Sequence, residues 1–309
     1  MLQAPFKQLP FTEVPDKPRI SHPYFNVKSQ MISFHSKPFG NVNLHLKTYG
    51  SGPPLLLVHG FMTTGYSWRY MIEPLGQHFT LYIPDLVGSG LSSKPEASYD
   101  PDSMAEFLHE MVRNLNIFGC RAIGNSLGGY LCMRAVLKFP GIFSRLVNLH
   151  SPGISTGRMQ VLRFALGMFP FSETVVRTLV NRNPEKWVHT NVHYYDESLK
   201  SKEEHREYSL PLKTPEGVHA FYLMLKQTLN VKEMQKFEKD LLSLNGYFPI
   251  PLLLVYAKKD PMVPPAVGKK MHRILPKVEF HWLDRGSHFA HVDATDLFVE
   301  KALPFLMAT

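Results

Sequence analysis

A serine, an aspartate and a histidine on three separate predicted loops have the chemistry of nucleophilic catalysis. Ser126 is the centre of a G-x-S-x-G pattern over residues 124–128, between a predicted strand and a predicted helix. Glycines two positions before and after the serine permit a very tight turn, which lifts the hydroxyl to the helix N-terminus. The partial positive charge there favours a developing anion. Ser126 is the predicted nucleophile, and an incidental serine in a glycine-rich turn is the alternative.

A serine hydroxyl needs a base, which a third group must hold in place. Asp260 follows the apolar run Ile250–Tyr256, and His288 follows Phe280–Leu283. Both lie where predicted strands end, the edge at which ligands gather in open α/β sheets. The order serine, acid, histidine is one known for such triads. We predict Asp260 as the acid and His288 as the base. His291, three residues further on, is a weaker alternative because it should point elsewhere.

Two backbone N–H donors must stabilise the oxyanion that forms during acyl transfer. Leu127 directly follows the nucleophile and supplies one. The segment His59-Gly60-Phe61-Met62 follows another apolar run, and we assign the second donor to Phe61, with Met62 as the reserve and a substrate contact. His59 is expected to anchor this loop. His150 lies just after Arg145–Leu149, at the same sheet edge, and is a candidate pocket residue, with a core histidine as the alternative.

The elements that position these residues alternate along the chain. We predict strands over 31–35, 42–49, 54–58, 79–83, 120–124, 145–149, 250–256 and 278–283, and helices over 101–116, 127–139, 265–275 and 294–306. This alternation predicts an α/β fold with a mostly parallel, doubly wound sheet.

The alternation stops between residues 153 and 247, where only helical segments are predicted. We interpret this stretch as a helical cap inserted between strands 6 and 7, with a core of residues 31–152 and 248–309 and an extended N-terminal arm over 1–30. Met159 and Phe164 belong to a Met- and Phe-rich part of the cap and are predicted to contact substrate. The alternatives are a helix packed on the core and a helix that touches membrane lipid.

Composition, net charge and the lengths of apolar runs limit the classes of function that the chain can have. The chain has 309 residues, 44% hydrophobic and 19% charged, which is typical of a globular protein. Its net charge of +8 is scattered without a run of five basic residues, which argues against nucleic-acid binding. Cys120 and Cys132 have no partner at metal-ligand spacing, so we expect no metal or other cofactor. With no apolar run of about 18 residues and no secretory signal, a cytoplasmic protein is expected, with membrane association as an alternative.

Several segments together resemble the α/β-hydrolase superfamily from about residue 30 to the end. Residues 59–69 and 286–294 resemble blocks of the haloalkane dehalogenase and epoxide hydrolase branch, and 85–92 resembles the superfamily's loop after the fourth strand. That branch uses an aspartate nucleophile where this chain has Ser126, and a dehalogenase would carry asparagine at Phe61. The chain is therefore more similar to carboxylesterases, monoacylglycerol-lipase-like enzymes and meta-cleavage-product C–C hydrolases.

The resemblance and the triad together predict a cofactor-independent serine hydrolase of a hydrophobic or amphiphilic carboxylic ester. The alternatives are C–C bond hydrolysis of a vinylogous diketone acid and a non-catalytic ligand receptor on the same fold. The oligomeric state, the acyl length and the alcohol moiety stay open.

Overall fold

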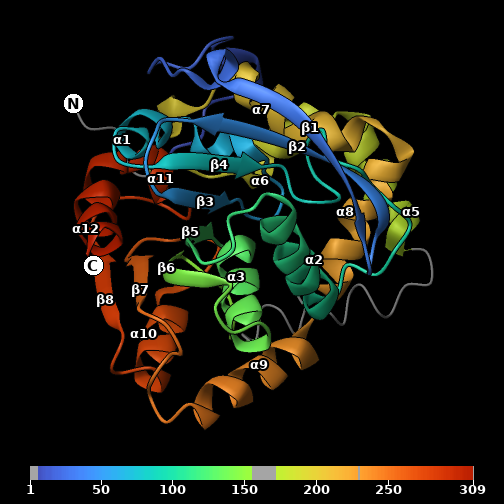
Figure 1. Cartoon of the computed structure of the whole chain (residues 1–309). Coiled ribbons are helices and arrows are strands. Elements are labelled where there is room, and N and C mark those ends of the chain that lie inside the picture. The colour runs from blue at the N-terminus through green and yellow to red at the C-terminus, as the bar shows by residue number, and fades with distance from the viewer. Residues whose placement is uncertain (1–5, 155–171, 229, 309) are drawn as a thin grey trace.

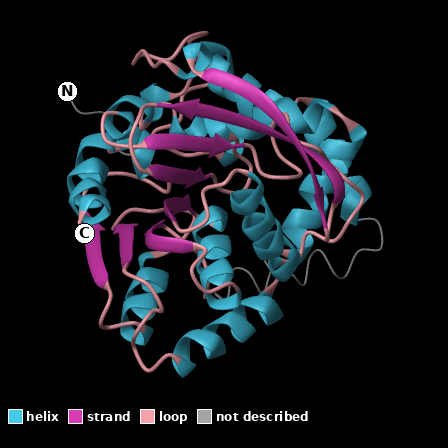
Figure 2. Ribbon diagram, in the orientation of Figure 1, coloured by secondary structure: helices cyan, strands magenta, loops and turns pink. Residues whose placement is uncertain are grey.

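A single sheet forms the centre of the protein in the computed structural model, which describes residues 6–154, 172–228 and 230–308 (Figure 1). Its strand order is β1-β2-β4-β3-β5-β6-β7-β8. The strands are β1 (Lys28–Ser36), β2 (Gly40–Tyr49), β3 (Pro54–Val58), β4 (Thr80–Pro84), β5 (Cys120–Asn125), β6 (Phe143–Leu149), β7 (Leu252–Ala257) and β8 (Glu279–Leu283). Helices cover both faces of this sheet (Figure 2).

The sheet is parallel except at one edge. β1 pairs with β2 and β2 pairs with β4 in antiparallel fashion. All other neighbouring strands, from β4 through β3, β5, β6 and β7 to β8, are parallel. The predicted α/β class with a mostly parallel sheet is therefore confirmed. The carboxyl ends of the parallel strands meet at one edge, and the predicted catalytic loops leave from that edge.

β3 shows how the sequence produces a sheet that is buried on both faces. Its residues after Pro54 are all apolar, and each is completely buried. Because successive side chains point to opposite faces, Leu56 and Val58 join one hydrophobic cluster while Leu55 and Leu57 join the other. A run without polar alternation is what a strand between two helical layers requires.

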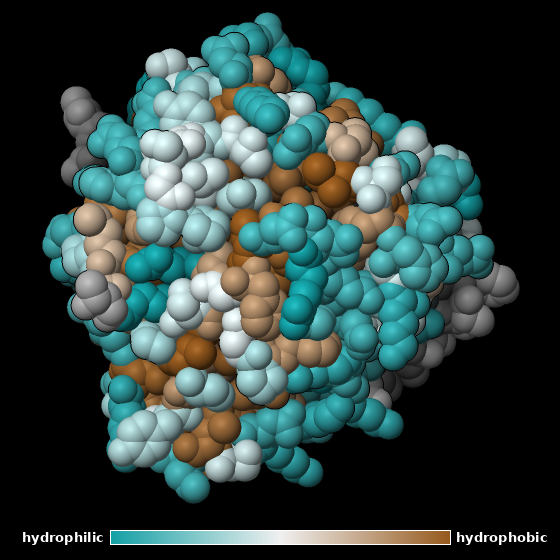
Figure 3. Space-filling view, in the orientation of Figure 1, coloured by the Kyte–Doolittle hydropathy of each residue, from teal (hydrophilic) through white to brown (hydrophobic). Residues whose placement is uncertain are grey.

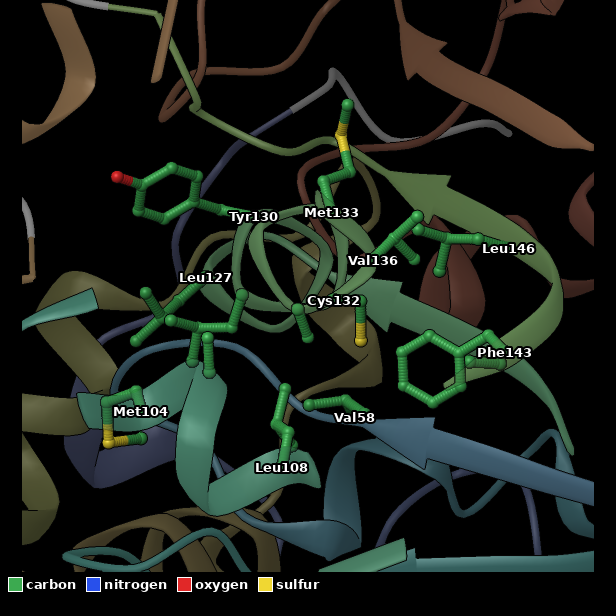
Figure 4. Close-up of a cluster of buried hydrophobic side chains, with 14 of the residues drawn as sticks. Val58, Met104, Leu108, Leu127, Tyr130, Cys132, Met133, Val136, Phe143 and Leu146 are labelled. Carbon is green, nitrogen blue, oxygen red and sulfur yellow. The ribbon is translucent and has the colours of Figure 1, made fainter. Parts of the chain in front are cut away.

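The helical layers use amphipathic helices. The cluster with Leu56 includes residues of α2 (Pro101–Asn114), α3 (Leu127–Lys138), α9 (Val231–Ser243) and α10 (Pro265–Ile274), and Figure 4 shows its part around α3. The opposite cluster includes residues of α1 (Ile72–Gly76), α11 (Ala290–Asp293) and α12 (Thr295–Met307). α2 begins where its sequence predicts: Asp100 accepts N–H groups of Asp102 and Ser103, and Pro101 occupies the first turn.

Helices and 3₁₀ turns make up the regular structure described between β6 and β7. They are α5 (Ser172–Arg182), α6 (Pro184–Asn191), η4 (Glu197–Leu199), α7 (Lys202–Ser209), η5 (Leu210–Lys213), α8 (Pro215–Gln227) and α9. α9 packs against the core helix α3, with the rings of Tyr130 and Phe237 5.0 Å apart and Arg134 paired with Glu233. The insertion thus contacts the core through its last helix as well as through its earlier ones.

The N-terminal arm lies on the helical insertion. The main-chain oxygens of Pro15 and Asp16 accept the N–H groups of Lys202 and Glu203, at 2.8 and 3.0 Å. These N–H groups belong to the first turn of α7 and have no partner within the helix. The side chain of Lys17 adds an ion pair with Glu203 at 2.8 Å. The arm therefore caps α7 from a distant part of the sequence.

Every helix within the described ranges is too short or too polar to cross a lipid bilayer.

Candidate active site

Ser126 lies on the turn from β5 to α3 with a left-handed backbone, φ 53°. Residues other than glycine rarely adopt such an angle, and it persists only where the surroundings hold it. A Cβ on Gly124 would lie 2.5 Å from the main chain of α3, and one on Gly128 would overlap main-chain oxygens at the end of β3. Ser126 precedes α3 without capping it through its side chain, so the hydroxyl remains available for chemistry.

Asp260 and His288 lie together, as the sequence predicts. The Nδ1 of His288 donates to the Oδ2 of Asp260 at 2.7 Å, and both side chains are buried. The other carboxylate oxygen accepts the N–H groups of Met262 and Val263 at 2.7 and 2.9 Å. Because Nδ1 carries the donated proton, the Nε2 of the neutral imidazole is free to accept one.

Hydrogen bonds also keep Asp260 ionised. Burial by itself raises the pKa of this carboxyl, but the neighbouring His288 and the N–H of Val263 outweigh the burial. The pKa of Asp260 therefore lies below its ordinary value. An ionised carboxylate on Nδ1 is the arrangement that holds a catalytic histidine and stabilises its imidazolium form.

Asn125 connects the serine turn to the histidine loop. Its Nδ2 donates to the main-chain oxygen of His288 at 3.0 Å, and the N–H of Ser126 donates to Leu149 at the end of β6 at 2.8 Å. In the described residues the Ser126 hydroxyl makes no hydrogen bond to the imidazole of His288. In ligand-free hydrolases such bonds are often long and tighten when substrate binds.

The loop after β3 is fixed by hydrogen bonds around Gly60. The Nδ1 of His59 and the hydroxyl of Thr63 both donate to its oxygen, at 2.9 and 3.0 Å. The Nε2 of His59 accepts the N–H of Leu86 at 2.9 Å, so the ring is neutral, and burial lowers its pKa. The predicted anchoring role of His59 fits these contacts. A Cβ on Gly60 would lie 3.1 Å from the Cβ of Ser126, which brings the loop of the predicted donor Phe61 close to the nucleophile.

Phe61 and Met62 face the helical insertion. The ring of Phe61 stacks on Phe221 of α8, with centroids 4.8 Å apart. Met62 has a left-handed backbone, φ 63°. A small cavity lies between this loop and the insertion, lined by Phe61, Met62, Thr63, Gly88, Ser89, Tyr208, Pro211, Leu212, Phe221 and Met224. Its lining contains no charged side chain among the described residues.

The two other predicted substrate contacts in the insertion, Met159 and Phe164, lie outside the described residues. His150, predicted to line the pocket, is completely buried, and its Nε2 accepts the N–H of Ala257 at 2.7 Å. A metal could in principle use His150, Asp260 and His288, whose donor atoms lie within 4.8 Å of one another. Hydrogen bonds already engage one nitrogen of each imidazole and both carboxylate oxygens, so these residues fit a proton-transfer site better than a metal site.

His291, the alternative base, packs against Trp68 with ring centroids 4.4 Å apart and is completely buried. Burial and the nearby Arg69 hold its pKa well below the ordinary value. Its neutral ring is part of the core under the histidine loop.

Three residues that shape this site were not predicted from the sequence. Asn125 was only a variable position of its motif, although it bridges to His288. Phe221 lies in the stretch where only helical segments were predicted, and it had no predicted role. Asp293 had no predicted role, yet its carboxylate accepts the N–H groups of Ser287 and Tyr195, at 3.1 and 2.6 Å. It therefore connects the histidine loop with the insertion. Of the three, only Asn125 carried a signal in the sequence, because its side-chain amide directly precedes the nucleophile.

Comparisons with known proteins agree with this architecture. A family model described as alpha/beta hydrolase fold matches residues 53–295. An uncharacterized protein of Mycobacterium tuberculosis is 34% identical over 116 residues, which is 38% of this chain and 34% of that protein's length. The chain thus spans about a third of that relative.

Relatives that match over most of their length carry several activities in their names. A pimeloyl-[acyl-carrier protein] methyl ester esterase of Vibrio vulnificus is 25% identical, covering 86% of this chain and 98% of that protein. A 2-hydroxy-6-oxo-2,4-heptadienoate hydrolase of Pseudomonas putida is 23% identical, covering 87% and 94%. The solved structure of a thermophilic esterase from Thermogutta terrifontis has a TM-score of 0.72 at 20% identity, covering 90% of this chain and 98% of that one.

Proposed function

The chain belongs to the α/β-hydrolase fold family, and we propose that it cleaves a hydrophobic carboxylic ester through an acyl-enzyme on Ser126. The observation that carries this proposal is the hydrogen bond between His288 and an ionised Asp260, on a loop that Asn125 joins to the left-handed turn of Ser126. Neither a fold nor ligand binding requires a buried carboxylate to orient an imidazole next to such a serine.

The proposed reaction uses these groups in the following order. The Oγ of Ser126 attacks the ester carbonyl while its proton passes to the Nε2 of His288. Asp260 stays ionised and stabilises the imidazolium. The N–H groups of Phe61 and Leu127 donate hydrogen bonds to the negatively charged tetrahedral oxygen. The C–O bond then breaks, and the leaving alcohol takes the proton from His288. Water, deprotonated by the same imidazole, hydrolyses the acyl-enzyme and restores Ser126.

The contact between the loop after β3 and the insertion supports an apolar substrate group, although the cavity left there is only about 20 Å³. The contact brings Phe61 and Met62 of the core against Leu212 and Phe221 of the insertion, and the cavity lining carries no charge among the described residues. Apolar pockets gain affinity by removing hydrocarbon from water, whereas a buried carboxylate would need a cation or several donors. An ester with an uncharged apolar acyl or alcohol part is therefore the proposed substrate class.

C–C bond hydrolysis is the second candidate, because the Pseudomonas putida relative carries such a substrate in its name. Compounds of this class bear a carboxylate, and the described cavity offers no lysine or arginine to receive one. Ester hydrolysis is therefore the favoured function. A higher turnover of a vinylogous diketone acid than of esters would reverse this preference.

Ester hydrolysis can be tested with p-nitrophenyl esters of graded acyl length. We expect the wild-type protein to turn over medium-chain esters and Ser126→Ala to lose at least about 10⁴-fold in kcat, because triad members act as a unit. Ser243→Ala, at the exposed end of α9, is the matched control and should keep full activity. Esterase activity retained in Ser126→Ala would contradict the proposal.

A further inference from the structure

His150 directly follows β6, and β7 holds it there. Its backbone is left-handed, φ 55°, an angle that a bulky side chain rarely adopts. The N–H of His150 donates to the oxygen of Val255 on β7 at 3.0 Å. Strained backbone of this kind persists only where neighbouring contacts determine it, and it clusters near active sites. The position of the imidazole is therefore fixed by the sheet itself.

The hydrogen bonds of His150 define its protonation. Its Nε2 accepts the N–H of Ala257 at 2.7 Å, so this nitrogen carries no proton, and the neutral ring has its proton on Nδ1. The ring is completely buried, and burial lowers its pKa to about 3. His150 is thus an uncharged acceptor at every pH at which ester hydrolysis is ordinarily measured.

The imidazole of His150 lies beside the acid and the base. Its ring centroid is 5.6 Å from that of His288, and a ring nitrogen lies within 4.8 Å of the donor atoms of Asp260 and His288. Among the described residues, the ring of Tyr256 also packs against it, edge to face at 6.0 Å. A neutral ring at this place does not repel the imidazolium that forms on His288 during catalysis, whereas a cation would.

A short chain of hydrogen bonds leads from His150 to the acid. Ala257 is the last residue of β7, and its oxygen accepts the N–H of Asp260 at 3.4 Å. The bond from the Ala257 N–H to His150 therefore fixes the residue from which the acid loop departs. Without that acceptor, the N–H of Ala257 would be buried and unpaired, and the end of β7 would move to find another partner.

We propose that His150 is a positioning residue of the Asp260–His288 pair. As a neutral acceptor it holds the end of β7, and through Ala257 it orients the carboxylate of Asp260 toward the Nδ1 of His288. It also fills the space beside the base without adding charge. For its kinetic test the inference rests on the proposed function.

Three substitutions separate the acceptor from the shape of the ring. In His150→Gln, the amide oxygen is as many bonds from the backbone as Nε2, so it can accept the N–H of Ala257. In His150→Asn, the amide is one bond too short, and in His150→Phe the ring has no acceptor. We expect kcat to fall less than about 3-fold in the Gln variant and about 10- to 100-fold in the Asn and Phe variants, since small misplacements of catalytic groups have effects of this size.

Further readouts distinguish positioning from substrate contact and from bulk stability. KM should change less than about 3-fold, because the ground-state pocket is intact. The acidic limb of the pH–rate profile should move to lower pH in His150→Phe, because a displaced Asp260 stabilises the imidazolium less. The control His205→Phe replaces a completely buried ring whose two nitrogens make no hydrogen bond to the described residues, and it should keep wild-type kcat. Equal kcat in the Gln and Asn variants, or a change confined to KM or to the melting temperature, would overturn the inference.

A spectroscopic arm is independent of turnover. The proton shared by His288 and Asp260 should give a downfield ¹H NMR signal, which we expect to persist in His150→Gln and to shift or broaden in His150→Phe. An unchanged signal in His150→Phe would overturn the inference. A changed signal in a protein that hydrolyses no ester would reject the proposed function and keep the role of His150.

Discussion

Asp260 is the residue with the most specific set of contacts in the candidate site. One of its carboxylate oxygens holds the imidazole of His288, and the other accepts two main-chain N–H groups. These bonds fix both the orientation and the charge of the carboxylate, and they select the His288 tautomer with a free Nε2. An amide at this position would keep the shape but could present a donor where an acceptor is needed.

Asp260→Asn should therefore fold and yet lose kcat by about 10⁴-fold, the effect of the equivalent change in serine proteases. Asp284→Asn is the control, because Asp284 lies in the next loop with an exposed ion pair to Lys258. Steady-state ester hydrolysis by the two variants measures the effect. Similar rates for both would show that Asp260 does not orient the base.

At the residue scale, local patterns predicted the loops but not the contacts between them. Ser126, Asp260 and His288 could be placed because each follows an apolar run in a recognisable order. The bonds from Asn125 to His288 and from Ala257 to His150 join residues more than 100 positions apart. No local pattern encodes such pairings, since they depend on the register of neighbouring strands.

At the element scale, a buried polar network ties α7 to the loop before α1. The Nη2 of Arg69 lies 2.5 Å from Glu204, and both side chains are completely buried. The hydroxyl of Tyr194 donates to the same carboxylate oxygen at 2.5 Å. The adjacent Glu203 accepts from Tyr66 at 2.8 Å and pairs with Lys17 of the N-terminal arm. Core, insertion and arm thus meet at the start of one helix.

Glu204→Gln should leave the Arg69 cation buried without a counter-ion, and breaking such a pair costs about 3–5 kcal/mol. We expect the melting temperature to fall by roughly 6–15 °C. Glu185→Gln, which removes a partly exposed pair with Lys213, should lower it by about 2 °C or less. Thermal unfolding followed by circular dichroism compares the two, and equal shifts would show that the network contributes little stability.

The elements themselves were largely predictable because apolar periodicity determines them. The strand predicted over 54–58 is β3, and the helix predicted over 127–139 is α3 within one residue. The packing of the N-terminal arm was less predictable: its prolines indicated extended chain, but not that Pro15 and Asp16 cap α7. Met159 and Phe164 of the predicted cap lie outside the described residues and stay predictions.

At the scale of the whole molecule, the chain carries a basic net charge of +8. Figure 3 shows one face, on which hydrophobic residues form separate patches among hydrophilic ones. The interior of the protein contains buried histidines. His150, His205 and His291 are all completely buried. Burial lowers the pKa of His150 and of His205 to about 3, and it holds the pKa of His291 well below its ordinary value.

These three histidines predict a protein that is sensitive to acid. Unfolded histidine takes up a proton near pH 6.5, whereas the buried rings do so only at far lower pH, so protons favour the unfolded chain below pH 6.5. Stability is therefore complete above that pH and is lost as the pH falls toward 3. Each ring contributes a slope of up to about 1.4 kcal/mol per pH unit.

Urea unfolding at pH 7, 6 and 5 would measure this slope. We expect His205→Phe to reduce it by about 1 kcal/mol per pH unit, because one buried titrating group is removed. His35→Asn, at an exposed position on β1, should leave the slope unchanged. An identical slope for wild type and His205→Phe would contradict the account.

The central claim, a serine activated by the His288–Asp260 pair, is tested most directly by a fluorophosphonate probe. Peptide mass spectrometry of the labelled wild-type protein should locate one adduct, on Ser126, and His288→Gln should slow its formation at least about 10³-fold. A folded protein that stays unlabelled, or one labelled at another residue, would contradict the claim and favour a ligand-binding role for this fold.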